Sequence, residues 1–192
     1  MHKWLLLLGL AACGDDGGSE IVDAPPGGGS ADAAPVVGEP ANLVGITAAH
    51  NQVRAMVQTA TALPALTWSP ALAATAAAWV AQCKDTEAPT GLVDHNAGRS
   101  TGHPYYVGEN IFASSGSATG QQAVTSWSAE GANYTYATNT CAAGKICGHY
   151  TQVVWRTTKE LGCALADCPA LQFKSTIVCD YGPGGNSGGA PY

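Results

Sequence analysis

The sequence predicts a disulfide-braced α+β domain in which helices lie on both sides of a small sheet. Three observations support this prediction. Apolar residues recur at helical spacing early in the domain, strand-like runs follow near its end, and six cysteines remain once Cys13 is set aside. An even number of cysteines in an exported chain argues for three disulfides. The six residues are Cys83, Cys141, Cys147, Cys163, Cys168 and Cys179.

Four segments have the apolar spacing of helices. The start of the second is the most clearly marked, because Ser69 is a suitable N-cap and Pro70 follows it at the first helical position. Leu72, Ala76, Trp79 and Val80 are then predicted to fall on one face of that helix. The predicted helices span residues 43–61, 70–83, 121–134 and 148–155.

The strands are expected later in the chain. An extended piece covers "VGENIFA" at residues 107–113. Two further runs, "LGCALA" at 161–166 and "QFKSTIVCDY" at 172–181, are predicted to pair, and β-branched residues support the second. Alternation of helices and strands gives the expected layering of helices around a sheet.

The N-terminus predicts export. Residues 1–13 combine a short basic start with an apolar run and small residues, which is the pattern of a signal peptide. Leu10-Ala11-Ala12-Cys13 also resembles a bacterial lipobox, in which Cys13 is lipidated and anchors the mature protein to the membrane. The alternative is an ordinary signal peptide that is cut near Ala12. The predicted location is the bacterial cell envelope, as a lipoprotein, or the extracellular space.

Composition then divides the exported chain. Residues 14–40 are rich in Gly, Ala, Pro and Asp, with six acidic residues and no Lys or Arg, and are predicted to form a disordered tether. The whole chain has a net charge of −6, but residues 41–192 hold seven basic and eight acidic residues. A nearly neutral domain has no electrostatic field for nucleic acid, so we expect no nucleic-acid partner.

Three titratable residues stand out in residues 41–192. Glu130 follows Trp127 by three positions, which places its carboxylate on an inward helix face unless the helix ends there and the side chain reaches solvent. Glu109 lies in the strand-like "VGEN", where the alternative is a turn carboxylate. His149 is also predicted to face inward, either as a ligand or as a hydrogen-bonded core residue. His50 is assigned to a structural hydrogen-bond network with its neighbours on the first helix.

The cysteine spacing alone does not fix the pairing, because six cysteines allow 15 connectivities. A zinc site made of cysteines is not favoured, since no C-x-x-C pair occurs in the chain. Motifs of zinc proteases, serine hydrolases and nucleotide-binding loops are also missing from the sequence.

From about Leu43 to Tyr192 the chain resembles the CAP superfamily, which contains cysteine-rich secretory proteins, insect antigen 5 and the group-one pathogenesis-related proteins of plants. The resemblance rests on these stretches, which occur in the family's order: "HNQVRA", "LTWSPALAATAAAWVAQC", "GENIF", "SWSAEGANYTYATNTCAAGKICGHYTQVVWRTTKELGCALADC" and "IVCDYGPGGN".

The resemblance implies a three-layer α-β-α sandwich with a small antiparallel sheet. It also implies a surface cavity lined by two histidines and two glutamates, which by motif are His95, Glu109, Glu130 and His149. His103 is the alternative to His95, because Cys83 lies further from His95 than the family pattern has it. The pairing that the resemblance implies is Cys83 with Cys168, Cys163 with Cys179, and Cys141 with Cys147.

Two histidines with two carboxylates could hold a divalent cation such as zinc, with His95 and His149 as its ligands and Glu109 and Glu130 beside them. The alternative is a hydrogen-bonded cluster that keeps the cavity rigid. The leading functional prediction is a non-catalytic binding module for an apolar ligand, either a lipid or a sterol-like molecule. The alternatives are an extracellular interaction protein with a structural cavity and a hydrolase or protease that uses the His/Glu cavity.

Overall fold

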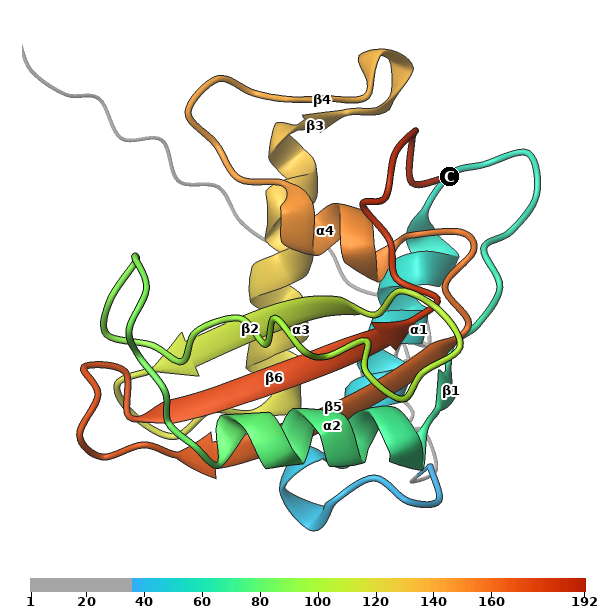
Figure 1. Cartoon of the computed structure of the whole chain (residues 1–192). Helices are drawn as coiled ribbons and strands as arrows, with labels where there is room; N and C mark the ends of the chain where they lie inside the picture. The colour runs from blue at the N-terminus through green and yellow to red at the C-terminus, as the bar shows by residue number, and fades with distance from the viewer. Residues whose placement is uncertain (1–35) are drawn as a thin grey trace, which may run out of the picture. The chain divides into compact units, whose positions relative to one another are not determined.

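The structure, a computed structural model, describes residues 36–192 (Figure 1). The predicted signal peptide, the lipidation of Cys13 and most of the predicted tether lie outside these residues and stay predictions. The described elements are η1 Ala41–Leu43, α1 Ile46–Met56, β1 Thr67–Trp68, α2 Pro70–Val80, β2 Gly108–Ser114, α3 Gly120–Ala129, η2 Glu130–Asn133, β3 Tyr134–Thr135, η3 Tyr136–Thr138, β4 Thr140–Cys141, α4 Gly148–Val153, β5 Glu160–Asp167 and β6 Ser175–Gly182.

The main sheet has the strand order β1-β5-β6-β2. β5 and β6 pair antiparallel over their whole length, as predicted, and β2 pairs antiparallel with the other side of β6. β1 adds two residues in parallel to the edge of β5, and β3 with β4 forms a separate two-stranded hairpin. The sequence did not predict these short strands, because two residues are too few to show an alternating pattern.

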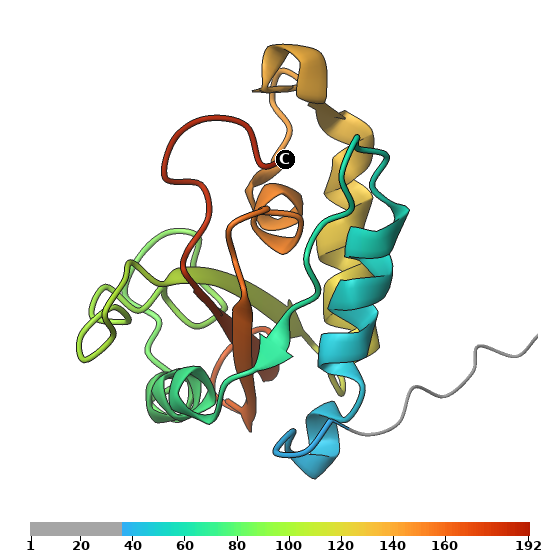
Figure 2. The same cartoon turned by 90° about the vertical axis from the view of Figure 1, so that its right-hand side faces the viewer.

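Helices cover both faces of this sheet, as Figure 2 shows from the side. One core lies between the sheet and helices α1, α3 and α4, and a second core lies against α2. The side chains of β6 alternate between them: Cys179 and Tyr181 belong to the first face, whereas Val178 faces α2. The three-layer α+β architecture is therefore confirmed.

Several predicted boundaries need correction; the first helix, for example, spans Ile46–Met56 rather than residues 43–61. Residues 36–40 were assigned to the tether, but Glu39 accepts hydrogen bonds from the backbone N–H groups of Gly45 (2.7 Å) and Thr47 (2.9 Å). This carboxylate satisfies N–H groups at the start of α1, so the tether prediction ran too far into the domain. The third helix is also shorter than predicted, since α3 ends at Ala129 and the chain continues as the 3₁₀ turn η2.

Three disulfides join the layers and loops, in the same pairs that the resemblance implies. Cys83–Cys168 ties the end of α2 to the β5–β6 connection, and Cys163–Cys179 joins β5 to β6. The third pair, Cys141–Cys147, closes the short loop that leads into α4. Among residues 36–192, no helix combines the length and the apolar character that crossing a membrane would require.

Candidate functional site

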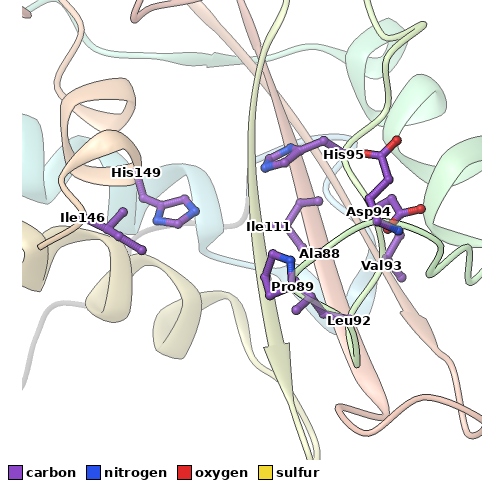
Figure 3. A pocket seen from close by; sticks show the side chains of 10 residues that line it. Ala88, Pro89, Leu92, Val93, Asp94, His95, Ile111, Ile146 and His149 are labelled. Atoms are coloured by element: carbon purple, nitrogen blue, oxygen red, sulfur yellow. The ribbon is translucent and has the colours of Figure 1, made fainter. Parts of the chain in front are cut away.

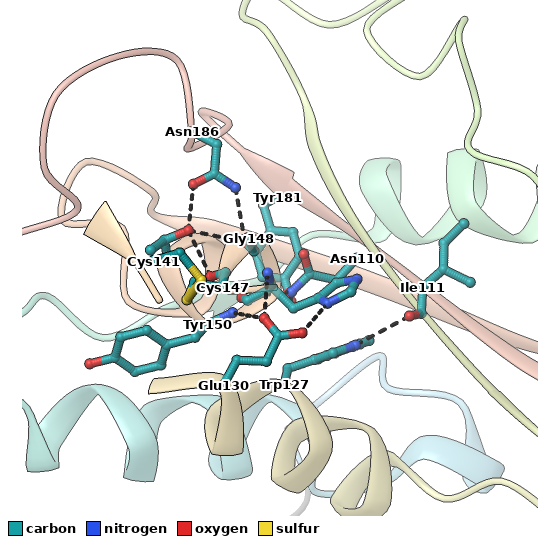
Figure 4. A network of polar contacts seen from close by, with 12 residues as sticks. Asn110, Ile111, Trp127, Glu130, Cys141, Cys147, Gly148, Tyr150, Tyr181 and Asn186 are labelled. Atoms are coloured by element: carbon teal, nitrogen blue, oxygen red, sulfur yellow. Dashed lines mark hydrogen bonds and ion pairs between the residues drawn. A yellow bond between two sulfur atoms is a disulfide. The ribbon is translucent and has the colours of Figure 1, made fainter. Parts of the chain in front are cut away.

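One half of the candidate site lies where α3 ends and α4 begins. Glu130 follows the last residue of α3, and His149 is the second residue of α4. The two side chains meet with 2.6 Å between His149 Nδ1 and Glu130 Oε1 (Figure 4). The other carboxylate oxygen, Oε2, accepts from the backbone N–H groups of His149 (3.0 Å) and Tyr150 (3.2 Å). Glu130 therefore orients the imidazole and also satisfies N–H groups at the start of α4.

Glu130 is held as a carboxylate by these contacts. Burial, the largest single influence, acts to raise the pKa of Glu130, but the hydrogen bond and charge of His149 and the two backbone N–H groups together outweigh it. The pKa of Glu130 is therefore below its usual value. Both of the opposing predictions were partly right: the helix ends at this residue, yet the side chain is only 18% exposed.

A buried polar network fixes the backbone under His149. The Asn110 amide donates to the carbonyl of His149 (3.1 Å) and to the hydroxyl of Tyr181 (3.1 Å). That hydroxyl lies 2.8 Å from His50 Nε2, and His50 Nδ1 lies 2.7 Å from the carbonyl of Ile46. Burial lowers the pKa of His50 to about 4, so this imidazole is neutral near pH 7. His50 is thus part of a hydrogen-bond network, as predicted, but its partners are Ile46 and Tyr181 rather than Asn51 and Arg54.

The other half of the site lies across β2. His95 comes from the long loop between α2 and β2, and Glu109 is the second residue of β2. His95 Nδ1 lies 2.6 Å from Glu109 Oε1, and the same oxygen accepts from the backbone N–H of Asn96 (2.9 Å). The side chain of His95 is 57% exposed, whereas that of Glu109 is fully buried. A buried carboxylate thus orients an exposed imidazole.

A third carboxyl group lies beside Glu109. Asp180 of β6 is the direct cross-strand partner of Glu109, and it is fully buried. Neither Asp180 oxygen has a hydrogen-bond partner with an N–H or hydroxyl donor, and Glu109 Oε2 has none either. Burial, followed by the negative charge of Glu109, raises the pKa of Asp180 to about 8.

His95 and His149 line one cavity of about 280 Å³ (Figure 3). Glu87 and Asp94 line it as well. The rest of the wall is apolar and comes from the loop before His95, from β2 and from the loop before α4. These apolar residues are Ala88, Pro89, Leu92, Val93, Ile111 and Ile146.

The structure therefore gathers the four predicted residues into two His–Glu pairs that face one cavity with their imidazoles. It also decides between the two candidate histidines. His103 does not line this cavity, since its Nε2 lies 3.0 Å from Thr75 Oγ1 on α2.

The geometry gives the predicted cation little support. Within residues 36–192, no three His, Cys, Asp or Glu side chains are arranged to hold a metal ion. Glu109 Oε1 and both oxygens of Glu130 already accept from imidazole Nδ1 atoms or from backbone N–H groups. Only the Nε2 atoms of His95 and His149 remain as cation ligands, and a structural zinc site normally has four ligands.

Asp180 and Asn110 belong to the site but were not singled out in the sequence. Asp180 reaches it through the pairing of β2 with β6, which joins positions about 70 residues apart, and Asn110 reaches it through the contact of β2 with α4. The spacing of neighbouring residues in the sequence does not indicate which distant residues pair in this way. A weak signal for Asp180 is a charged residue inside a strand-like run of β-branched residues.

Together, the three-layer fold, the three disulfides and the paired His–Glu residues define a small disulfide-braced cavity domain. Residues 47–181 match the family described as CAP, the cysteine-rich secretory protein family. This match covers more than half of the chain, and the chain belongs to that family.

Relatives and a solved structure agree with this assignment. The chain is 40% identical over 146 residues to "Pathogenesis-related protein PR-1 type" of Sambucus nigra, which covers 75% of this chain and 78% of the relative. It is 35% identical over 166 residues to "GLIPR1-like protein 1" of Homo sapiens, covering 82% of this chain but 64% of that relative, a little under two thirds. The structure of Schistosoma mansoni venom allergen-like protein 4 matches with a TM-score of 0.57 and 29% identity, over 77% of this chain and 90% of that one.

Proposed function

We propose that this CAP domain is a non-catalytic binding module, and that its cavity takes up a small apolar ligand with one polar end. The observation that supports the proposal is the lining of the cavity, which is apolar except for Glu87, Asp94 and the two histidines. Ligand pockets combine such apolar walls with a few placed polar groups. The free Nε2 atoms of His95 and His149 are suited to hydrogen-bond the polar end of a lipid.

The size of the cavity limits the ligand. Its volume of about 280 Å³ lies just below the ~300 Å³ at which pockets for drug-sized ligands begin. A small lipid, or the end of a longer acyl chain, fits this volume better than a whole sterol. Fatty-acyl ligands are therefore the favoured class, and sterol-like ligands are the comparison.

The binding test uses the exported chain with decanoic acid and cholesterol as probes. Leu92→Trp fills the cavity from its apolar wall, and we expect it to weaken decanoic acid binding at least tenfold. Val44→Trp adds the same bulk at an exposed position outside the cavity and is the matched control. Ile146→Asp, at an exposed rim position, is a second test that does not disturb the core.

The outcomes separate the competing functions. Equal binding by Leu92→Trp and Val44→Trp would exclude the cavity as the lipid site. If neither probe binds the unaltered chain, the interaction-protein alternative is favoured. Peptide or ester hydrolysis that disappears in His149→Ala but persists in His103→Ala would favour the hydrolase.

A divalent cation is a secondary part of the proposal. Each imidazole is held at Nδ1 by a carboxylate, which is also how proteins orient metal-bound histidines. Zinc titration of the exported chain, of His149→Ala and of the His103→Ala control tests this point. Zinc binding that is the same in all three proteins would exclude the cavity histidines as ligands.

The membrane anchor at Cys13 is proposed from Leu10-Ala11-Ala12-Cys13 alone. Membership in a family described as secretory agrees with export. Cys13→Ser should release the protein from the membrane fraction of a bacterial host, whereas the control Gly18→Ser should stay attached. A mature protein that lacks the mass of acyl chains would refute the anchor and leave the ordinary signal peptide.

A further inference from the structure

Two carboxyl groups lie side by side in the main sheet, because Asp180 and Glu109 occupy directly opposed positions on β6 and β2. Val178 and Ile111, two residues away on the same strands, pack in the core against α2, so both carboxyl groups face that side of the sheet. Both side chains are fully buried. Two carboxylates in such a place would repel each other with no water to screen them.

The hydrogen-bond partners show how this repulsion is avoided. Glu109 Oε1 accepts from His95 and from the backbone of Asn96, which favours the ionised form of Glu109. Glu109 Oε2 has no such donor, and neither oxygen of Asp180 has one. A proton on Asp180 would supply the missing donor, because the two carboxyl groups occupy directly opposed positions on the same face of β6 and β2.

We propose that Asp180 is a positioning residue of the cavity: it stays protonated and donates a hydrogen bond to Glu109 Oε2. A hydrogen-bonded chain then runs from Asp180 through Glu109 to His95 Nδ1. This role of Asp180 is to hold His95 in place, and it does not depend on which ligand the cavity binds.

No nearby charge replaces this proton. Arg99, on the loop between α2 and β2, is the cation whose charge acts on Asp180. Its guanidinium donates to the carbonyls of Val107 and Asn96 and to the hydroxyl of Tyr106, and forms no ion pair with either carboxyl group. Helix α2 has no titratable side chain, and the cross-strand partner of Asp180 on β5 is Gly162.

Tyr105 lies on the same face of the sheet, against Gly182, and its hydroxyl donates to Glu160 rather than to Asp180. Two further neighbours with titratable groups are His95 and Tyr181. His95 reaches Asp180 through Glu109 only. Tyr181 follows Asp180 along β6, but its hydroxyl points to the opposite face of the sheet, where it contacts His50 and Asn110. The two His–Glu pairs thus differ in one respect: backbone N–H groups hold the second oxygen of Glu130, and a carboxyl proton holds that of Glu109.

The test compares Asp180→Asn with the unaltered chain over pH 5–9. Asparagine keeps the shape and can donate an N–H to Glu109, so it imitates the protonated acid without titrating. The folded protein keeps the Asp180 proton after the unfolded chain has lost it, so the folding equilibrium constant of the unaltered chain should fall with rising pH, by up to about tenfold per pH unit. This slope should disappear in Asp180→Asn and persist in Asp167→Asn, the control at an exposed carboxyl of β5.

A second measurement keeps the inference testable if the variant fails to fold. Carboxyl ¹³C NMR of the unaltered chain should show Asp180 still protonated at pH 6, and the His95 Nδ1–H signal should shift as Asp180 loses its proton. The inference would be overturned if the folding equilibrium constant of Asp180→Asn changed with pH as steeply as that of the unaltered chain. It would also be overturned if the Asp180 carboxyl ionised near pH 4. No ligand enters either measurement, so failure here is distinct from failure of the lipid-binding proposal.

Discussion

Replacing Glu130 with Gln tests how the α3–α4 half of the cavity is built. Three N–H donors point at the two oxygens of Glu130: His149 Nδ1–H and the backbone N–H groups of His149 and Tyr150. Gln has one acceptor oxygen, and its amide nitrogen would face at least one of these donors. The variant therefore loses a hydrogen bond to a charged group and leaves a partly buried donor without a partner.

The size of the effect follows from those contacts. A hydrogen bond to a charged group contributes about 1.5–3 kcal/mol, and an unsatisfied buried donor costs about 1–3 kcal/mol. Because the pair is 29% and 18% exposed, we expect a loss of about 2–4 kcal/mol in the free energy of unfolding. For a domain of this size that corresponds to a decrease in Tm of roughly 5–12 °C.

The assay is thermal and urea denaturation of the exported chain at pH 7. Glu87→Gln makes the same chemical change at an exposed position on the edge of the same cavity and is the control. The His149 Nδ1–H signal should also be lost from proton NMR spectra of Glu130→Gln. Equal Tm values for the two variants would refute the view that Glu130 organises α4.

Two further predictions concern the sheet and its core. Gly162→Ala should lower the free energy of unfolding by about 3 kcal/mol or more, because a Cβ there would lie 2.1 Å from the backbone nitrogen of Ala73. Urea denaturation measures this loss, and a value under about 1 kcal/mol would contradict the prediction. Burial lowers the pKa of His50 to about 4, so the unfolded chain binds its proton first and stability should fall from pH 6.5 to 4, by up to about 1.4 kcal/mol per pH unit. His50→Gln should remove this acid-side loss and His103→Gln should not, which a series of Tm measurements against pH would show.

The sequence allowed most of the architecture to be predicted, because helices and long strands carry their own periodicity. The Ser69-Pro70 start of α2 is an example: the helix begins at Pro70, and Leu72, Ala76 and Val80 are its buried residues. His149 was also predictable as an inward-facing group from its helical spacing, whereas the spacing left Glu130 open between an inward face and a helix end. The resemblance, rather than any local pattern, supplied the partnership between the four cavity residues.

What escaped prediction depends on the register between distant strands. Glu109 could be a turn carboxylate as far as its neighbours in sequence show, and only the alignment of β2 with β6 places Asp180 opposite it. The protonation of Asp180 follows from that alignment and from burial, neither of which can be derived from sequence spacing. The same applies to Asn110, which reaches His149 because β2 passes beneath α4.

The construction of the cavity indicates where its selectivity resides. The two imidazoles are held by carboxylates that leave them little freedom, so they offer the same polar groups to any ligand. Most of the apolar wall instead comes from the loop before His95. Asp94 shapes this loop by accepting from the backbone N–H groups of Thr86 (2.9 Å) and Glu87 (3.0 Å). Val93 of this loop is buried in the core against the sheet, whereas Ala88 and Pro89 are exposed and can change without disturbing the His–Glu pairs. Changes in ligand preference should therefore follow substitutions at Ala88 and Pro89, and changes in stability should follow substitutions at Val93 and at the pairs.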